Sequence, residues 1–217
     1  MSSYYPVFLK LSGRRCVVVG GGQVALRKVQ TLLKCGARVE VVSPDVCAGL
    51  EELNSRRKIS IIRRGYKHGD IGRAFLAIAA TGDTDINTEV EQEAEQRGVP
   101  VNIVDNRELS SFIVPSFLRR GDITIAVSTA GRSPALARRI RTRLEKDIGI
   151  EYAALAEIVD EVRSEIKKKG IQIGPDDWQE AMDVDSMIEL LKKGERQKAK
   201  NLLLKNLKKP GDKQTEE

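Results

Sequence analysis

Residues 17–22 run from three β-branched valines directly into three glycines, and a helical pattern follows. Residues 14–19, which end in the apolar run CVVV, predict a buried strand, and the apolar spacing over 23–35 predicts a helix that ends at Gly36. Residues 38–44 predict a second strand, which ends at a proline. Strand, glycine turn, helix and strand within about 30 residues make one βαβ unit. This unit commits the beginning of the chain to a parallel α/β sheet.

The alternation continues beyond this unit. Residues 58–64, 74–81 and 100–105 predict further strands, and 83–98 predict a polar helix. The second of these runs is short and apolar, as in strands that are buried on both faces of a sheet. Alternating strands and helices predict a Rossmann-type parallel sheet with right-handed crossovers.

The pattern changes in the second half of the chain. Residues 110–131 predict two extended segments around a turn near Gly121. A helix is predicted over 133–149, with Ser133 as its N-cap and Pro134 at its first position. The remainder is predicted to be helical, in segments 151–170, 176–194 and 195–209. We therefore expect an α/β domain over 1–112, a small α+β segment over 113–149, a helical domain over 150–209 and a disordered tail over 210–217.

The glycine turn fits the pattern G-x-G-x-x-A through Gly20, Gly22 and Ala25. In this pattern the first glycine allows a tight turn, the second lets the backbone approach a pyrophosphate, and the small third residue lets the helix pack on the sheet. The start of the helix adds unpaired N–H groups and a partial positive charge. A glycine turn without a ligand is the alternative, but the strand before it and the helix after it favour a bound dinucleotide.

The end of the second strand bears on the choice between NAD and NADP. The acid that binds the ribose normally stands there, but this chain has Ser43 at that place, followed by Pro44 and Asp45. No arginine stands beside Ser43 to pair with a 2′-phosphate, which favours NAD. Asp45 has two open roles, as a ribose contact or as a turn or helix-capping residue.

Ligands collect at the carboxyl ends of the strands in an open parallel sheet. Those ends present Gly20–Gly22, Ser43–Asp45, Thr81–Gly82 and Asp105–Asn106. Asp105 is the acid that directly follows an apolar strand at this edge. It has two open roles, as a general base or as half of a turn-forming Asp-Asn pair.

The net charge is +6, and arginines surround the "STAGRSP" turn and the helix after it. These are Arg119, Arg120, Arg132, Arg138, Arg139, Arg141 and Arg143. Arginines beside a helix N-terminus suit carboxylates or phosphates, and a solvated helix face is the alternative. Aromatic residues make up only 4% of the chain, which disfavours a stacking platform for single-stranded nucleic acid.

The three cysteines, Cys16, Cys35 and Cys47, form no CxxC pair, and the single histidine is His68. We therefore expect free buried thiols in a reducing cytoplasm, no metal site, and a surface-loop position for His68. The beginning of the chain lacks the long apolar run of a signal peptide, and no stretch approaches the roughly 20 apolar residues of a membrane span.

Together these motifs resemble one family. Four segments carry the resemblance, and they cover roughly residues 6–150: "PVFLKLSGRRCVVVGGGQVALRKV", "LAIAATGDTDIN", "VNIVD" and "SSFIVPSFLRRGDITIAVSTAGRSPALARRIR". In their order and spacing the chain resembles the precorrin-2 dehydrogenase family, which is the N-terminal module of siroheme synthases. The resemblance implies NAD-dependent dehydrogenation of precorrin-2 to sirohydrochlorin. It also implies a homodimer formed through the 113–149 segment. The helical remainder matches the family only in character.

The resemblance also assigns residues. The key aspartate of the family falls on Asp105, which favours the catalytic role. In the pattern of the family, Gln23–Val24 and Pro44–Asp45 contact the cofactor. With the glycine turn and the strand ends, the predicted cofactor contacts are Gly20, Gly22, Gln23, Val24, Ser43, Pro44, Asp45 and Thr81. The substrate of the family carries eight carboxylates, which would explain the arginines and the net charge. The predicted substrate-binding residues are Ser128, Arg132, Ser133 and Arg138.

Two alternatives remain open. Some members of the family also insert iron into sirohydrochlorin, and nothing in this sequence decides that activity. A non-enzymatic NAD-sensing module that binds DNA would explain the glycine turn and the basic charge, but it requires neither Asp105 nor the "STAGRSP" turn. No helix-turn-helix signature is recognisable, although the helical C-terminal part could contain one. We expect a cytoplasmic enzyme without nucleic-acid or membrane partners.

Overall fold

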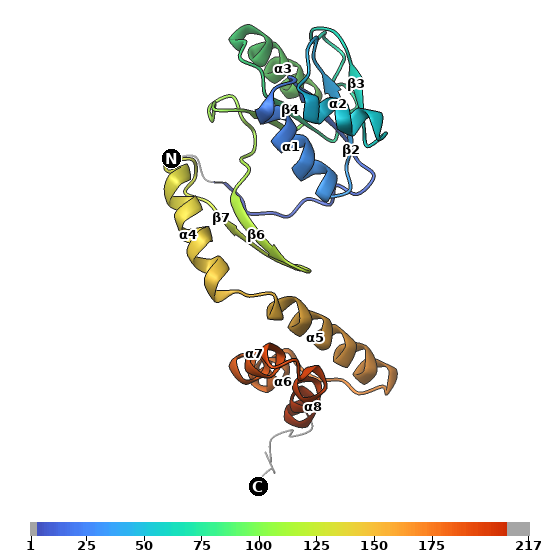
Figure 1. Ribbon diagram of the computed structural model, residues 1–217, viewed down its shortest axis with the longest axis vertical. Helices are drawn as coiled ribbons and strands as arrows, with labels where there is room; N and C mark the ends of the chain where they lie inside the picture. Colours follow the sequence, from blue (N-terminus) through green and yellow to red (C-terminus); the bar gives the residue numbers. More distant parts are fainter. Residues whose placement is uncertain (1–3, 208–217) are drawn as a thin grey trace. The chain divides into compact units, whose positions relative to one another are not determined.

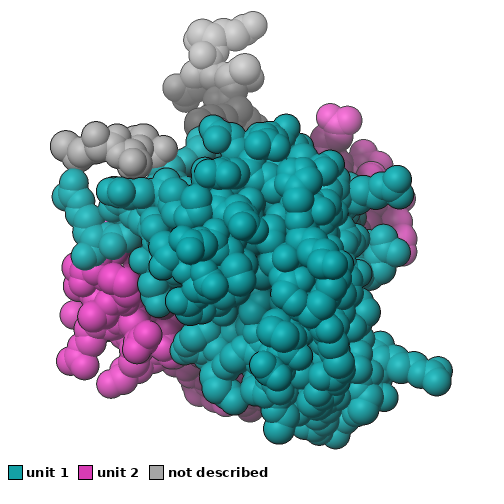
Figure 2. Space-filling view, turned by 90° about the horizontal axis from the view of Figure 1, so that it is seen from above, with its two compact units in different colours: residues 1–114, 130–132 teal, residues 115–129, 133–217 magenta. Residues whose placement is uncertain are grey.

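The computed structural model describes residues 4–207, and the chain divides into two compact units (Figure 2). Unit 1 comprises Met1–Val114 together with Ala130–Arg132, and unit 2 comprises Pro115–Thr129 and Ser133–Glu217. The predicted division at 112/113 and 149/150 stays a prediction, and the predicted tail over 210–217 lies outside the described residues.

Unit 1 is built on a five-stranded parallel sheet with the order β3-β2-β1-β4-β5 (Figure 1). The strands are β1 Arg15–Val19, β2 Arg38–Val42, β3 Ile59–Ile62, β4 Leu76–Ala79 and β5 Val101–Ile103. The helices are α1 Gln23–Lys34, α2 Ala48–Ser55 and α3 Thr84–Arg97. The predicted Rossmann-type α/β architecture is confirmed.

Helix α2 was not expected from the sequence. Only Leu50 is buried among its eight residues, so the helix has no repeating apolar stripe for a pattern search to find. It begins after Cys47, whose N–H donates to the Gly21 carbonyl at 2.8 Å.

The sheet is buried on both faces. Along β1, Cys16 and Val18 pack in one apolar cluster with residues of α1 and α2, whereas Val17 and Val19 pack in a second cluster with residues of α3. Both clusters use alternate residues of the same strand. A strand covered in this way reads as an unbroken apolar run, which explains the "CVVV" sequence.

Unit 2 begins with an antiparallel hairpin, β6 Ser116–Arg120 and β7 Ile123–Val127, against which α4 Pro134–Asp147 packs. Gly121 lies in the hairpin turn with φ +56°, as predicted. The predicted N-cap is also confirmed, because Ser133 Oγ accepts the Leu136 N–H at 3.2 Å and Pro134 is the first helical residue.

Four helices complete unit 2: α5 Glu151–Lys168, α6 Pro175–Ala181, α7 Val184–Lys192 and α8 Arg196–Leu207. They share one apolar core that includes Ile158, Met187 and Leu203. The prediction of a single helical segment over 176–194 was wrong. Helix α6 ends at Ala181, and Asp183 starts the next helix, because its carboxylate accepts the Ser186 N–H at 3.2 Å as the cap of α7.

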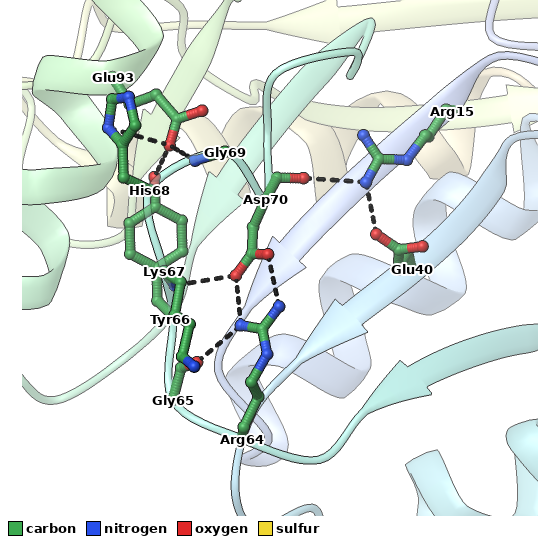
Figure 3. A network of polar contacts seen from close by, with 10 residues as sticks. All are labelled: Arg15, Glu40, Arg64, Gly65, Tyr66, Lys67, His68, Gly69, Asp70 and Glu93. Atoms are coloured by element: carbon green, nitrogen blue, oxygen red, sulfur yellow. Dashed lines mark hydrogen bonds and ion pairs between the residues drawn. The ribbon is translucent and has the colours of Figure 1, made fainter.

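The loop between β3 and β4 carries the polar network of Figure 3. Glu93 of α3 is fully buried and accepts hydrogen bonds from the Tyr66 hydroxyl and, at 2.8 Å, from the Gly69 N–H. Arg97 Nε lies 2.8 Å from the other carboxylate oxygen, as an ion pair without hydrogen-bond geometry. His68 is exposed on this loop, as predicted, with Nδ1 3.7 Å from Glu93. The network ties the loop to α3.

Asp70 closes the other half of the network. Arg64 donates two hydrogen bonds to its carboxylate, at 2.7 and 2.8 Å, and the Lys67 N–H donates a third at 2.9 Å. Arg15 donates to the Asp70 carbonyl at 2.8 Å and pairs with Glu40 of β2. The loop is thereby fastened to two strands of the sheet.

We expect Asp70→Asn to lower the free energy of unfolding at pH 7 by about 1 kcal/mol. The hydrogen bonds from Arg64 hold the pKa of Asp70 below its usual range in the folded protein. The stability that they contribute is therefore full above about pH 4 and is lost as the pH falls through the folded pKa. Denaturant titrations at pH 7 and pH 3 measure the difference.

The matched control is Glu52→Gln, which breaks an exposed surface pair with Arg56. This change should shift stability by less than about 0.5 kcal/mol at either pH. A deficit of Asp70→Asn that is equally large at both pH values would contradict the assignment.

Candidate functional site

The strand ends of unit 1 lie in one row. Val19 pairs with Val42 on one side and with Ala79 on the other, and Ala79 pairs with Ile103. The residues that follow these four begin the loops containing the predicted glycine, serine, threonine and aspartate positions. The strand order reverses between β1 and β4, which is where an open α/β sheet leaves a crevice for a ligand.

The three glycines have three different environments. Gly20 has φ +117°, and a Cβ there would lie 2.4 Å from the Ala80 carbonyl oxygen. A Cβ on Gly21 would lie 1.8 Å from the Asp45 carbonyl oxygen, whereas a Cβ on Gly22 would meet no atom within 4 Å. The first two glycines are required for packing of the chain on itself. The third faces open space, as expected for a backbone that a pyrophosphate approaches.

Helix α1 starts without a protein cap. Gly22 is its N-cap residue, no side chain caps it, and its first turn contains no acid. By contrast, Asp83 caps α3 by accepting the N–H groups of Asp85 and Ile86. Gln23 and Val24 open α1, so their N–H groups have no partner within the helix. These residues fit the pyrophosphate of a dinucleotide.

The loop after β2 supports the glycine turn. Ser43 is buried, and its hydroxyl donates to the Asp45 carbonyl at 2.7 Å. This bond places the carbonyl directly against Gly21. Pro44 and Asp45 are exposed at the site edge. The predicted cofactor contacts of Ser43, Pro44 and Asp45 stay predictions, with the Ser43 hydroxyl already engaged in the turn.

Thr81 lies after β4 and is half-buried. Its Oγ1 accepts the Asp83 N–H at 3.1 Å and lies 2.8 Å from the side-chain oxygen of Asn87. The Asn87 amide in turn donates to the Thr81 carbonyl at 3.3 Å. Thr81 is therefore held against the start of α3, and its predicted contact with the cofactor stays a prediction.

Asp105 and Asn106 have separate roles in the turn after β5. The Asn106 side chain accepts the N–H groups of Glu108 and Leu109, both at 3.1 Å. Asp105 is exposed and adopts a left-handed backbone with φ +60°. Asn106 therefore supplies the side-chain hydrogen bonds that close the turn, and the catalytic role of Asp105 stays a prediction.

Lys28 is a site residue that sequence reasoning missed. It is half-buried on α1, and its Nζ lies 3.5 Å from the side-chain oxygen of Asn102 on β5. Burial lowers the pKa of Lys28, Arg27 lowers it further, and the Asp105 carboxylate acts in the opposite direction. The lysine therefore adds a positive charge that interacts with Asp105. Its partners are 74 and 77 positions away in the chain, so no local pattern could have revealed it.

The "STAGRSP" turn is divided between the two units. Ala130–Arg132 belongs to unit 1, the unit that contains Asp105. Arg107 donates to the Ala130 carbonyl at 2.8 Å and was also missed by sequence reasoning. Ser128, Ser133 and Arg138 belong to unit 2, and their predicted contact with the substrate stays a prediction.

The remaining arginines of the predicted cluster fall into two groups. Arg120 donates to the Ile148 carbonyl at 3.1 Å, and Arg141 pairs with Glu145 on α4. The exposed members are Arg119, Arg132, Arg138, Arg139 and Arg143. The exposed group includes the two arginines predicted to bind substrate.

The three cysteines are free, but only Cys16 is buried, whereas Cys35 and Cys47 are half-buried. The prediction of three buried thiols was therefore wrong for two of them. Within residues 4–207, no three His, Cys, Asp or Glu side chains gather closely enough to hold a metal ion. The helices of the same range include none with the length and apolar character needed to cross a membrane.

Comparison with known proteins gives two family matches. Residues 7–116 match the "Putative NAD(P)-binding" family, and residues 120–146 match the family described as "Sirohaem biosynthesis protein central". The first match covers the whole sheet of unit 1 and its glycine turn. It confirms the prediction of a nicotinamide dinucleotide as cofactor.

Curated relatives include the siroheme synthase of Thioalkalivibrio sulfidiphilus, 46% identical over 76% of this chain and 34% of its own length. The siroheme synthase of Methylobacillus flagellatus is 43% identical over 76% of this chain and 35% of its own length. The chain thus spans about a third of the length of each of these two relatives.

A solved structure of SirC, a precorrin-2 dehydrogenase, has a TM-score of 0.71 and 26% sequence identity. The match covers 95% of this chain and 100% of that one, so the likeness continues into the C-terminal helices. Fold, motifs and matched relatives agree, and the chain belongs to the NAD(P)-binding family of siroheme synthases, in which the sirohaem biosynthesis central domain follows the dinucleotide-binding sheet.

Proposed function

We propose that this chain is an NAD-dependent dehydrogenase that oxidises precorrin-2 to sirohydrochlorin. One observation carries the proposal: the strand registers bring two features to the same edge of one sheet. These are the glycine turn, which leads into a helix without a side-chain cap, and an exposed aspartate. The siroheme synthase relatives and the structural likeness to SirC, a precorrin-2 dehydrogenase, support this choice of substrate.

In the proposed reaction the substrate loses a hydride and a proton as a new double bond forms. When bound, NAD⁺ supplies the hydride acceptor. Gly22 and the start of α1 hold its pyrophosphate, Gly20 and Gly21 keep the turn tight, and Asp105 accepts the proton at its carboxylate. The Lys28 ammonium interacts electrostatically with that carboxylate.

The substrate is an anion with many carboxylates, and the proposed binding residues are Ser128, Arg132, Ser133 and Arg138. The net charge of +6 and the exposed arginines support this assignment, because guanidinium groups bind carboxylates in a bidentate manner. The NAD preference, as opposed to NADP, rests on Ser43 and on the exposed carboxylate of Asp45 at the end of β2.

We further propose a homodimer formed through residues 113–149. Phe117 on β6 and Leu136 and Ile140 on α4 are exposed apolar side chains in this segment, and exposed apolar patches mark association surfaces. Light scattering of the purified protein should give twice the monomer mass.

The three free cysteines support a cytoplasmic location.

The test is an anaerobic assay of the purified chain with precorrin-2 and NAD⁺. We expect NADH and the sirohydrochlorin spectrum to appear together, in equal amounts. Addition of Fe²⁺ or Co²⁺ then tests for chelation. If the metal enters sirohydrochlorin no faster than it does without enzyme, the protein is a dehydrogenase only. If the metal enters faster, the protein is also a chelatase.

Absence of NADH formation would contradict the proposed function. A binding module would then be the better account, and a salt-dependent gel shift with duplex DNA would test it. We expect no such shift.

A further inference from the structure

The segment Ala130–Arg132 has an unusual backbone. Ala130 and Gly131 both lie in the left-handed region, with φ +51° and +78°. Left-handed geometry is unfavourable for alanine, whereas glycine adopts it readily, so Ala130 is the residue whose backbone needs support from other residues. The residues before and after the segment, Thr129 and Ser133, belong to unit 2, whereas the segment itself packs with unit 1.

Arg107 provides that support. Its Nη1 donates to the Ala130 carbonyl at 2.8 Å, across 23 positions of the sequence. A Cβ on Gly131 would lie 2.5 Å from Arg107 Cδ, so the arginine side chain lies directly against the glycine. One side chain therefore contacts both left-handed residues, by a hydrogen bond and by packing.

Arg107 extends from a rigid loop. Besides the two bonds that Asn106 accepts, the Ser110 hydroxyl accepts the Ile103 N–H at 2.9 Å and donates to the Asn106 carbonyl at 2.6 Å. These bonds anchor the loop to the end of β5. Asp105 lies two residues before Arg107 in the same anchored loop.

We propose that Arg107 is a positioning residue, which docks the Ala130–Arg132 segment on the loop that carries Asp105 and thereby orients Arg132 for a carboxylate of the substrate. The inference rests on the proposed function, because it takes Arg132 to bind the substrate and takes Arg107 to keep Arg132 in the orientation that this binding needs. The glycine turn that holds the cofactor is formed by other loops, so Arg107 should act on the tetrapyrrole and not on NAD⁺.

The first test compares the full chain with Arg107→Ala, Arg107→Lys and the control Arg73→Ala, which removes an exposed arginine of the same unit. We expect Arg107→Ala to raise KM for precorrin-2 at least tenfold, with KM for NAD⁺ and kcat within twofold of wild type. Arg107→Lys should recover part of the loss, because an ammonium can still donate to the carbonyl. The control should match wild type.

A merely structural role would change both KM values and kcat together, and that result would overturn the inference. So would an Arg107→Ala protein with the wild-type KM for precorrin-2. If wild type itself fails to oxidise precorrin-2, the proposed function fails first, and the docking is then decided by a measurement that needs no substrate.

That measurement is hydrogen exchange of the amides at 130–132. We expect exchange there to be at least tenfold faster in Arg107→Ala than in wild type or Arg73→Ala, with α1 unchanged. Gly131→Ala should also raise exchange in the wild-type background, because its methyl group displaces Arg107, and should add less in the Arg107→Ala background. Unchanged exchange in Arg107→Ala would refute the docking.

Discussion

Asparagine at position 105 is expected to lower kcat for precorrin-2 oxidation by about 100- to 10,000-fold, the usual contribution of a general base. Asparagine keeps the shape of the side chain but cannot accept the proton. The left-handed backbone at this position, with φ +60°, suits asparagine as well as it suits aspartate. Because the side chain is exposed, the free energy of unfolding and the affinity for NAD⁺ should stay near wild type.

Rapid kinetics of NADH formation with the purified variant measure this loss. The matched control is Glu108→Gln, which neutralises another exposed acid of the same loop and should leave kcat within twofold of wild type. An Asp105→Asn protein that folds, binds NAD⁺ and turns over at the normal rate would exclude Asp105 as the base.

Alanine substitutions in the glycine turn should separate folding from cofactor binding. Gly20→Ala and Gly21→Ala place a methyl group 2.4 and 1.8 Å from backbone carbonyl oxygens, and Gly20 also has φ +117°. The Ala80 carbonyl directly follows β4, and the Asp45 carbonyl is held by the Ser43 hydroxyl, so we expect each change to lower the free energy of unfolding by about 3 kcal/mol or more.

Gly22→Ala should behave in the opposite way. Its methyl group meets no atom within 4 Å, and its backbone, with φ −83°, is open to any residue. The melting temperature should therefore stay within a few degrees of wild type, while the dissociation constant for NAD⁺ rises by about tenfold or more, because the methyl group occupies the approach of the pyrophosphate. Thermal melts and NAD⁺ titrations of the three variants measure both effects. Unchanged NAD⁺ affinity in Gly22→Ala would place the cofactor elsewhere.

The parts of the fold that were predictable have strong local signals. A β-branched run indicates strand β1, a glycine pattern indicates the turn after it, and an amphipathic repeat indicates α1. Ser133 and Pro134 likewise marked the start of α4. Helix α2 was missed because one buried leucine makes no periodicity, and the break between α6 and α7 was missed because Asp183 is an N-cap within a continuous helical pattern.

The candidate site divides along the same line. The loops at the strand ends were predictable, because parallel strands bring their carboxyl ends to one edge. The roles of Gly21, Lys28 and Arg107 were not, since each depends on an approach between segments at least 23 positions apart. The distinction between Asp105 and Asn106 was equally hidden, because both residue types form turns and only the hydrogen bonds show that Asn106 closes this one.

The central claim is that the hydride of precorrin-2 passes to a dinucleotide held on the glycine turn. Its most direct test is a single turnover with precorrin-2 that carries deuterium at the carbon losing the hydride, in ordinary water, followed by mass spectrometry of the cofactor. We predict one deuterium per NADH formed by the wild type, and a smaller fraction of Gly22→Ala that transfers deuterium at NAD⁺ concentrations that saturate the wild type only. Sirohydrochlorin formed without deuterium in the cofactor would contradict the account.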